Sequence, residues 1–202
     1  LWLLRDLNLS GNELTGTLPP RLPARLQILS LARNHFSGTL PRVVTKLSRL
    51  AYLHLGHNAF SGTIPRAVAM LTKLEVLNLF NNALTGELPP ALGSLTKLRI
   101  LALGMNALTG GVPAELEDLV DIKYMTLVGN EGMAVGRNTW PTNLEKLAKR
   151  PSTSVWHGAG GRDMGTGVGR GEGGDDTDDG GASSQSVEEN FEGIFHRNFD
   201  YP

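Results

Sequence analysis

Leucines and other apolar residues recur along most of the chain in a pattern with a period of about 24 residues. The clearest copy runs from Leu47 to Pro65, and a second copy begins 24 residues later at Leu71. In each copy one residue separates two leucines, as in Leu53 and Leu55, and this spacing turns both side chains to the same face of a short strand. A fixed period of this length predicts a solenoid, in which each repeat buries its apolar side only against its neighbours.

One asparagine follows the paired leucines in every repeat, at successive intervals of 22, 24, 24, 24 and 24 residues. The chain must bend sharply where each strand ends, and a buried bend leaves backbone groups without partners. A carboxamide carries donors and an acceptor, so one side chain per repeat can satisfy those groups. We therefore predict a structural ladder that consists of Asn12, Asn34, Asn58, Asn82, Asn106 and Asn130.

A second short segment follows each of the first five asparagines and has the form apolar-Thr/Ser-Gly-x-apolar-Pro. Its copies are Leu14–Pro19, Phe36–Pro41, Phe60–Pro65, Leu84–Pro89 and Leu108–Pro113. Glycine permits an unusual backbone conformation here, and proline prevents a strand from continuing. Together with the leucine pattern, these segments resemble the plant-type leucine-rich repeat of 24 residues, and the resemblance covers residues 1–133.

The resemblance implies a curved α/β solenoid of about six rungs with a parallel inner sheet, and a second short strand at each Thr/Ser-Gly segment. The family is common in receptor ectodomains and secreted inhibitors of land plants. Between the strands, residues 66–71, 91–95 and 114–119 can form one or two helical turns. Three prolines, Pro19, Pro20 and Pro23, should keep the shorter second connection extended.

The remaining sequence divides into three parts. Residues 134–150 are predicted to cap the last rung with Trp140 and a short helix over residues 141–149. Residues 151–186 are rich in Gly and Asp and are predicted to form a disordered linker. Residues 187–202 form a short apolar segment, either a docking peptide or an irregular terminus. Its apolar residues Val187, Phe191, Ile194 and Phe195 have the spacing of one helix face.

Because Leu1 already stands inside a repeat, we expect residues 1–133 to be an N-terminally truncated solenoid.

Charge and composition exclude several classes of function. Residues 1–130 have 12 basic and 8 acidic residues, whereas residues 131–202 have 7 basic and 12 acidic residues. This balance lacks the dense basic stripe of a nucleic-acid-binding protein. The five histidines form no metal-ligand or catalytic pattern, and the chain has no cysteine. We therefore predict no enzyme activity, no cofactor and no metal, and the sequence shows no transmembrane segment.

Function is then expected on the inner sheet, at the positions that alternate with the leucines. The side chains there that suit protein recognition are Arg33, Tyr52, His54, His57, Phe80, Asn81 and Met105. Phe80 is the sharpest candidate, since its column otherwise holds small residues and Val128. These observations predict binding of a protein or peptide ligand on the concave face.

Three functions fit this surface. The chain is the recognition part of a receptor-like signalling or defence protein, an intracellular scaffold or adaptor, or a secreted inhibitor of a foreign enzyme. The repeat type favours an extracellular or membrane-associated location, with attachment through sequence outside this chain. The absence of cysteine favours the cytoplasm, because secreted repeats of this type usually have cysteine-paired caps.

Overall fold

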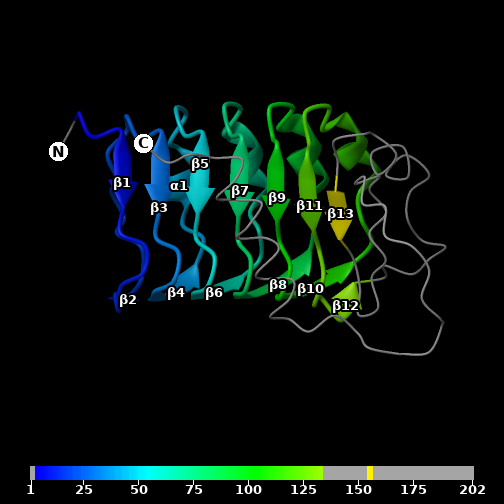
Figure 1. Cartoon of the computed structure of the whole chain (residues 1–202), viewed down its shortest axis with the longest axis horizontal. Coiled ribbons are helices and arrows are strands. Elements are labelled where there is room, and N and C mark those ends of the chain that lie inside the picture. Colours follow the sequence, from blue (N-terminus) through cyan, green and yellow to red (C-terminus); the bar gives the residue numbers. More distant parts are fainter. Residues whose placement is uncertain (1–2, 134–153, 157–202) are drawn as a thin grey trace, which may run out of the picture.

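The computed structural model describes residues 3–133 and 154–156, which form a curved solenoid of two parallel sheets (Figure 1). The inner sheet has seven strands, and its neighbours pair in the order β1-β3-β5-β7-β9-β11-β13. These strands are β1 (Asp6–Asn8), β3 (Ile28–Ser30), β5 (Tyr52–His54), β7 (Val76–Asn78), β9 (Ile100–Ala102), β11 (Tyr124–Thr126) and β13 (Ser154–Trp156). The first six strands come from the six predicted repeats, so each repeat contributes one rung.

The second sheet is built from the Thr/Ser-Gly segments, as the resemblance implied. Its strands are β2 (Thr15–Gly16), β4 (His35–Thr39), β6 (Ala59–Gly62), β8 (Ala83–Glu87), β10 (Ala107–Gly110) and β12 (Gly132–Met133). The glycine in each of the first five segments has a positive φ, for example 77° at Gly86, which few other residues adopt without strain. The proline that closes each segment then ends the strand and precedes the next connection.

The connections on the far side of the inner sheet are short helices. They are α1 (Arg42–Thr45) and the 3-10 helices η1 (Arg66–Met70), η2 (Pro90–Ser94) and η3 (Ala114–Asp118). A proline precedes each of them in an extended conformation and fixes where the helix begins. The second connection, residues 17–27, holds no helix or strand, as its three prolines predicted.

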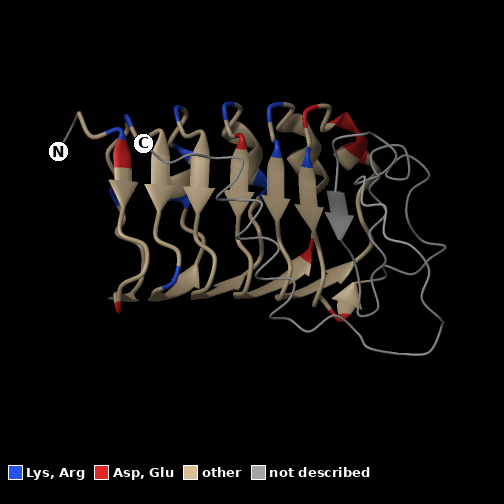
Figure 2. Ribbon diagram, in the orientation of Figure 1, with Lys and Arg blue, Asp and Glu red and all other residues tan. Residues whose placement is uncertain are grey.

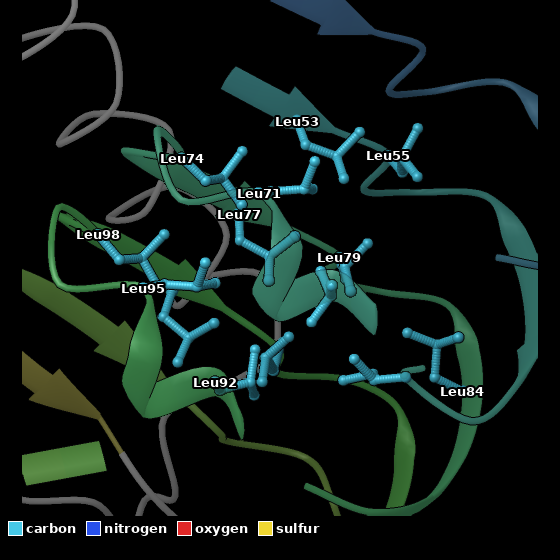
Figure 3. Close-up of a cluster of buried hydrophobic side chains, with 14 of the residues drawn as sticks. Leu53, Leu55, Leu71, Leu74, Leu77, Leu79, Leu84, Leu92, Leu95 and Leu98 are labelled. Carbon is cyan, nitrogen blue, oxygen red and sulfur yellow. The ribbon is translucent and has the colours of Figure 1, made fainter. Parts of the chain in front are cut away.

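The core is enclosed by the inner sheet, the second sheet and the short helices, and it consists mainly of leucines stacked in columns along the array (Figure 3). Leu53 and Leu77, at equivalent positions of adjacent rungs, are both fully buried or nearly so. Phe36 and Phe60 replace leucine beside the second sheet, and their rings stack with centroids 6.3 Å apart. Each rung therefore buries its apolar side chains against the next, and the array has one continuous core rather than six separate ones.

The asparagines form a ladder that ties each bend to the preceding rung. The side-chain amide of Asn82 donates to the carbonyl of Leu55 at 3.1 Å and to that of Leu79 at 3.2 Å. Its Oδ1 accepts the backbone N–H of Phe60 at 3.0 Å. Asn34, Asn58, Asn106 and Asn130 repeat this arrangement. One side chain thus satisfies backbone groups of two rungs at once.

The C-terminal end of the inner sheet differs from the expectation. Residues 154–156, assigned to the linker, form β13 and pair in parallel with β11 in the register Tyr124↔Ser154 to Thr126↔Trp156. The sequence missed this strand because three residues outside the repeat spacing carry no periodic signal. Trp140 and the predicted capping helix lie outside the described residues, as do residues 157–202.

Replacing Asn82 by Ala should lower the free energy of unfolding by roughly 1–3 kcal/mol, because buried backbone groups on two rungs lose their partners. Asn12→Ala is the matched control, since the exposed Asn12 amide donates only to Leu9 and Ser10 of its own bend. Urea unfolding of both variants measures the difference. Equal losses would contradict the role assigned to the contacts between rungs.

Replacing Gly93 by Ala should destabilise the array by about 2 kcal/mol or more. Gly93 lies in η2 with its Cα against the backbone of Glu115 in η3, and an added Cβ would overlap the Glu115 carbonyl. Gly111→Ala is the control, because nothing lies within 4 Å of a Cβ at Gly111. Thermal unfolding should show a clear loss for the first variant and a change within about 0.5 kcal/mol for the second. Similar melting temperatures for the two would show that η2 and η3 do not pack this closely.

Candidate functional site

The face of the inner sheet that points away from the leucine core, here called the concave face, carries the candidate residues. Side chains alternate along each strand, so Leu77 enters the core while Val76 and Asn78 lie on the concave face. The parallel register places equivalent residues side by side, as in Tyr52↔Val76 and Val76↔Ile100. The concave face is therefore a set of columns that cross the rungs at the strand spacing of about 4.8 Å.

An apolar cluster occupies this face over the later rungs, separate from the leucine core. Its members, called the concave patch, are Val76, Phe80, Ile100, Ala102 and Tyr124. All five are buried, with exposed fractions of 0–2%. Tyr52, Met105 and Val128 pack against the patch and are partly buried. The inner sheet thus has apolar side chains packed on both of its faces.

Phe80 and His54 were expected to be exposed, and this expectation is wrong. Phe80 is 0% exposed, and its ring lies over Gly104 of the next rung, with its centroid 5.6 Å from that of the His57 ring. A Cβ on Gly104 would come within 2.9 Å of Phe80 Cε2, so the missing side chain makes room for the ring. His54 is 4% exposed. Neither residue offers a free side chain in this structure.

Of the other five candidates, Tyr52 lies in β5, whereas the remaining four lie in the turns that follow the inner strands. Arg33 and Asn81 are exposed, whereas Tyr52, His57 and Met105 are half-buried. Asn81 Nδ2 lies 3.1 Å from Nδ1 of His57, so the amide N–H donates to the ring of the preceding rung. The structure therefore brings His57, Phe80 and Asn81 together, and it places polar groups beside the concave patch.

Tyr52 belongs to a polar group at the start of the inner strands. Burial raises the pKa of Tyr52, and the nearby Glu75 carboxylate raises it further. Arg99 lies across from Glu75, with Nη1 3.7 Å from Oε2. The protonated Tyr52 phenol donates a hydrogen bond to the Glu75 carboxylate, which is a further reason for its raised pKa.

The residue before each ladder asparagine adopts a left-handed backbone conformation, which the sequence pattern did not reveal. The φ angles are 56° at Arg33, 55° at His57, 52° at Asn81 and 54° at Met105. Glycine fills the same position in the first and last rungs, at Gly11 and Gly129. Non-glycine residues adopt this conformation at a cost, and they persist in it where the surrounding structure determines the turn. Four candidate side chains thus project from a strained row of turns.

The sequence offered a signal for the patch residues that were not selected. The column six residues before each asparagine reads Asp6, Ile28, Tyr52, Val76, Ile100 and Tyr124. Five of these six are apolar or aromatic, on a face that alternates with the core. Such a column indicates a second buried surface, although Tyr52 is its one member among the predicted binding residues.

Basic residues line the edge at which the inner strands begin. Figure 2 shows Lys and Arg gathered along this edge. The basic edge consists of Arg25, Arg49, Lys73 and Lys97 in the turns before four strands, with Arg99 and Lys123 just before β9 and β11. All but the half-buried Arg99 are exposed. Basic residues outnumber acidic ones along this edge, where Asp6, Glu75 and Asp121 also lie.

Two further properties bear on function. Among residues 3–133 and 154–156, no group of three or more His, Asp or Glu is placed to hold a metal ion. In the same part of the chain, the helices are too short and too polar to cross a membrane.

Comparisons with known proteins agree with this architecture. Sequence profiles of the leucine-rich repeat match residues 3–24 and 24–84. No curated protein matches the chain significantly. The chain belongs to the leucine-rich-repeat family, in the plant type found in receptor ectodomains.

Three solved structures illustrate the similarity. The leucine-rich-repeat ectodomain of the membrane receptor kinase GASSHO1/SCHENGEN3 from Arabidopsis thaliana, in complex with CASPARIAN STRIP INTEGRITY FACTOR 2, is 37% identical, with a TM-score of 0.56 over 59% of this chain and 14% of that chain. The plant peptide hormone receptor RGFR1 in complex with RGF2 is 25% identical, with a TM-score of 0.64 over 76% of this chain and 23% of that chain. A chain of the BIR3–SERK2 complex from Arabidopsis thaliana is 33% identical, with a TM-score of 0.57 over 65% of this chain and 70% of that chain. This chain therefore spans less than a quarter of the first two receptors.

Burial lowers the pKa of His54 from 6.5 to about 4, which makes stability depend on pH. The folded chain keeps His54 neutral, while the unfolded chain takes up a proton as the pH falls below about 6.5. The contribution of neutral, buried His54 to the free energy of unfolding is thus fully present above pH 6.5 and is lost progressively as the pH falls toward 4. Urea unfolding at pH 7.5 and 4.5 should show a loss about 2–3 kcal/mol larger for the wild type than for His54→Gln. Equal losses in the two proteins would mean that His54 is accessible to protons in the folded state.

Proposed function

We propose that this chain is a peptide- or protein-binding module that holds its ligand on the concave face, as the recognition part of a receptor-like signalling or defence protein. The observation that carries the proposal is the concave patch, flanked by Arg33, Tyr52, His57, Asn81 and Met105. Aromatic residues, Met and Arg are enriched where proteins contact one another, and apolar centres with polar surroundings are typical of such contacts.

The geometry of the sheet suits an extended ligand. The rungs from β3 to β11 cover four steps of about 4.8 Å, or roughly 19 Å. A peptide in extended conformation rises about 3.3 Å per residue, so about six residues would cross these rungs. Polar groups that the ladder and the turns hold in place can then pair with its backbone. Because the surface is built before the ligand arrives, little conformational entropy is lost on binding.

The named neighbours support the same class of ligand. The GASSHO1/SCHENGEN3 ectodomain was solved in complex with CASPARIAN STRIP INTEGRITY FACTOR 2, and the receptor RGFR1 is a peptide hormone receptor in complex with RGF2. By analogy we assign a peptide or small protein ligand to this chain.

Peptides selected from a displayed random library on the immobilised 202-residue chain provide a direct test. Tyr52→Ala should weaken binding of the selected peptides by about 30-fold, the loss expected for a hot-spot residue of about 2 kcal/mol. Tyr52 is a better probe than Phe80, because truncating the fully buried Phe80 would also affect folding.

Arg66→Glu is the matched control, since Arg66 is exposed in η1 on the opposite side of the inner sheet. Calorimetry should show an unchanged affinity for this variant. If Arg66→Glu abolishes binding while Tyr52→Ala has no effect, the concave-face assignment is wrong.

A further inference from the structure

The concave patch is buried, although its side chains point away from the leucine core. Phe80 and Val76 are 0% exposed, and Tyr124 is 2% exposed. Among the described residues, no helix and no second sheet lies over this face (Figure 1). The side chains on the free face of a single sheet remain in contact with water unless other residues lie over them. The nearly complete burial of these five apolar side chains therefore requires another segment over the patch.

We propose that the chain's own C-terminal segment, residues 187–201, docks on the concave patch and occupies the ligand site from within the same molecule. This inference rests on the proposed function, since it concerns the face assigned to ligand binding. The segment has the right chemistry for the patch. Val187, Phe191, Ile194 and Phe195 are spaced at i, i+4, i+7 and i+8, so a helix of about two and a half turns would present all four to one surface.

The attachment point makes this docking geometrically easy. β13 ends at Trp156 and is the neighbour of β11, which carries Tyr124 of the patch. Residues 157–186 provide 30 residues before Val187. A Gly-rich chain of this length spans about 30 Å on average. The patch extends only from β11 to β7, or about 14 Å from β13 in three strand steps.

This proximity raises the local concentration of the segment. A short tether of this kind holds its end at an effective concentration on the order of 1 mM. Even a segment with a dissociation constant of about 100 μM would therefore be docked most of the time. Four apolar side chains on an apolar patch are sufficient for an affinity of that order.

Charge favours the same partner. From Gly171 to Glu192 the chain has eight acidic residues and no Lys or Arg. The edge beside the patch carries Lys97, Arg99 and Lys123. Glu75 and Asp121 lie at the same edge, and Glu75 pairs with Arg99, so Lys97 and Lys123 are the cations that would attract the acidic stretch. The acidic stretch and the basic edge attract each other and guide the segment to this side of the sheet.

Self-docking would regulate the site. An external ligand must displace the segment, so its apparent affinity falls in proportion to the fraction of molecules that are open. Removing the segment's apolar side chains would therefore increase the affinity for an external peptide while leaving the solenoid intact.

Paramagnetic NMR on the full chain tests the proposal. The chain has no cysteine, so Gly193→Cys gives a unique attachment point for a nitroxide spin label. Amide signals of Val76, Ile100 and Tyr124 should lose more than half their intensity, whereas those of η1 should keep theirs. The added substitutions Phe191→Ser, Ile194→Ser and Phe195→Ser should restore the patch signals. These changes lie outside the solenoid, and the unchanged signals of η1 confirm that it remains folded.

A mixed sample distinguishes docking within one molecule from docking between two molecules. In it, one protein carries the spin label but no NMR-active isotope, and the other carries the isotope but no spin label. Broadening of the patch signals in this mixture would show that a second copy of the chain covers the patch. Absence of broadening in both the mixture and the doubly labelled chain would mean that a separate partner covers the patch. Either result overturns the proposal.

The proposed function has its own readout in the same variants. If no broadening occurs but selected peptides bind the wild type and the triple serine variant equally, self-docking fails and ligand binding stands. If broadening occurs but the peptides bind neither the wild type nor the triple serine variant, self-docking stands and the proposed ligand binding fails. A tenfold or greater gain in peptide affinity for the triple serine variant is the result that both proposals predict.

Discussion

The stacking of one rung on the next is the interaction on which this structure depends. No repeat of about 24 residues can bury its leucines alone, so every rung needs its neighbours. The asparagine ladder adds hydrogen bonds that join each rung to the one before it. The amide of Asn82 donates to carbonyls of two successive rungs while its oxygen accepts from the preceding one. This single contact fixes the rung spacing, and the spacing in turn sets the columns on the concave face.

The function follows from what the stacking leaves free. The leucines and the asparagines are committed to the array, so variation is confined to positions that alternate with them. In the first rung these positions are polar, with Asp6 and Asn8 exposed on β1. In the later rungs they are apolar and buried, with Val76 and Ile100 as examples. A uniform scaffold thus carries a surface that differs from one end to the other.

Much of the fold was predictable because the repeat multiplies a weak signal six times. The six rungs followed from the spacing of the leucines and asparagines, whereas the second sheet was implied by the resemblance to the plant-type repeat. β13 was missed because it occurs once, outside the period. Among the candidate residues, only Tyr52 lies within an inner strand, where alternation applies, whereas Arg33 and Asn81 lie in left-handed turns that the pattern did not reveal. The burial of Phe80 was also missed, because alternation does not show that its ring packs over Gly104 and within the concave patch.

The central claim is that the concave face of rungs two to six is the surface that contacts a ligand. Methyl NMR of the chain, recorded with and without a selected peptide, tests this claim most directly. The account predicts that the methyl signals of Val76, Ile100 and Val128 shift, while those of Val68 in η1 and Leu92 in η2 remain in place. Shifts confined to Val68 and Leu92, with the patch signals unchanged, would contradict it.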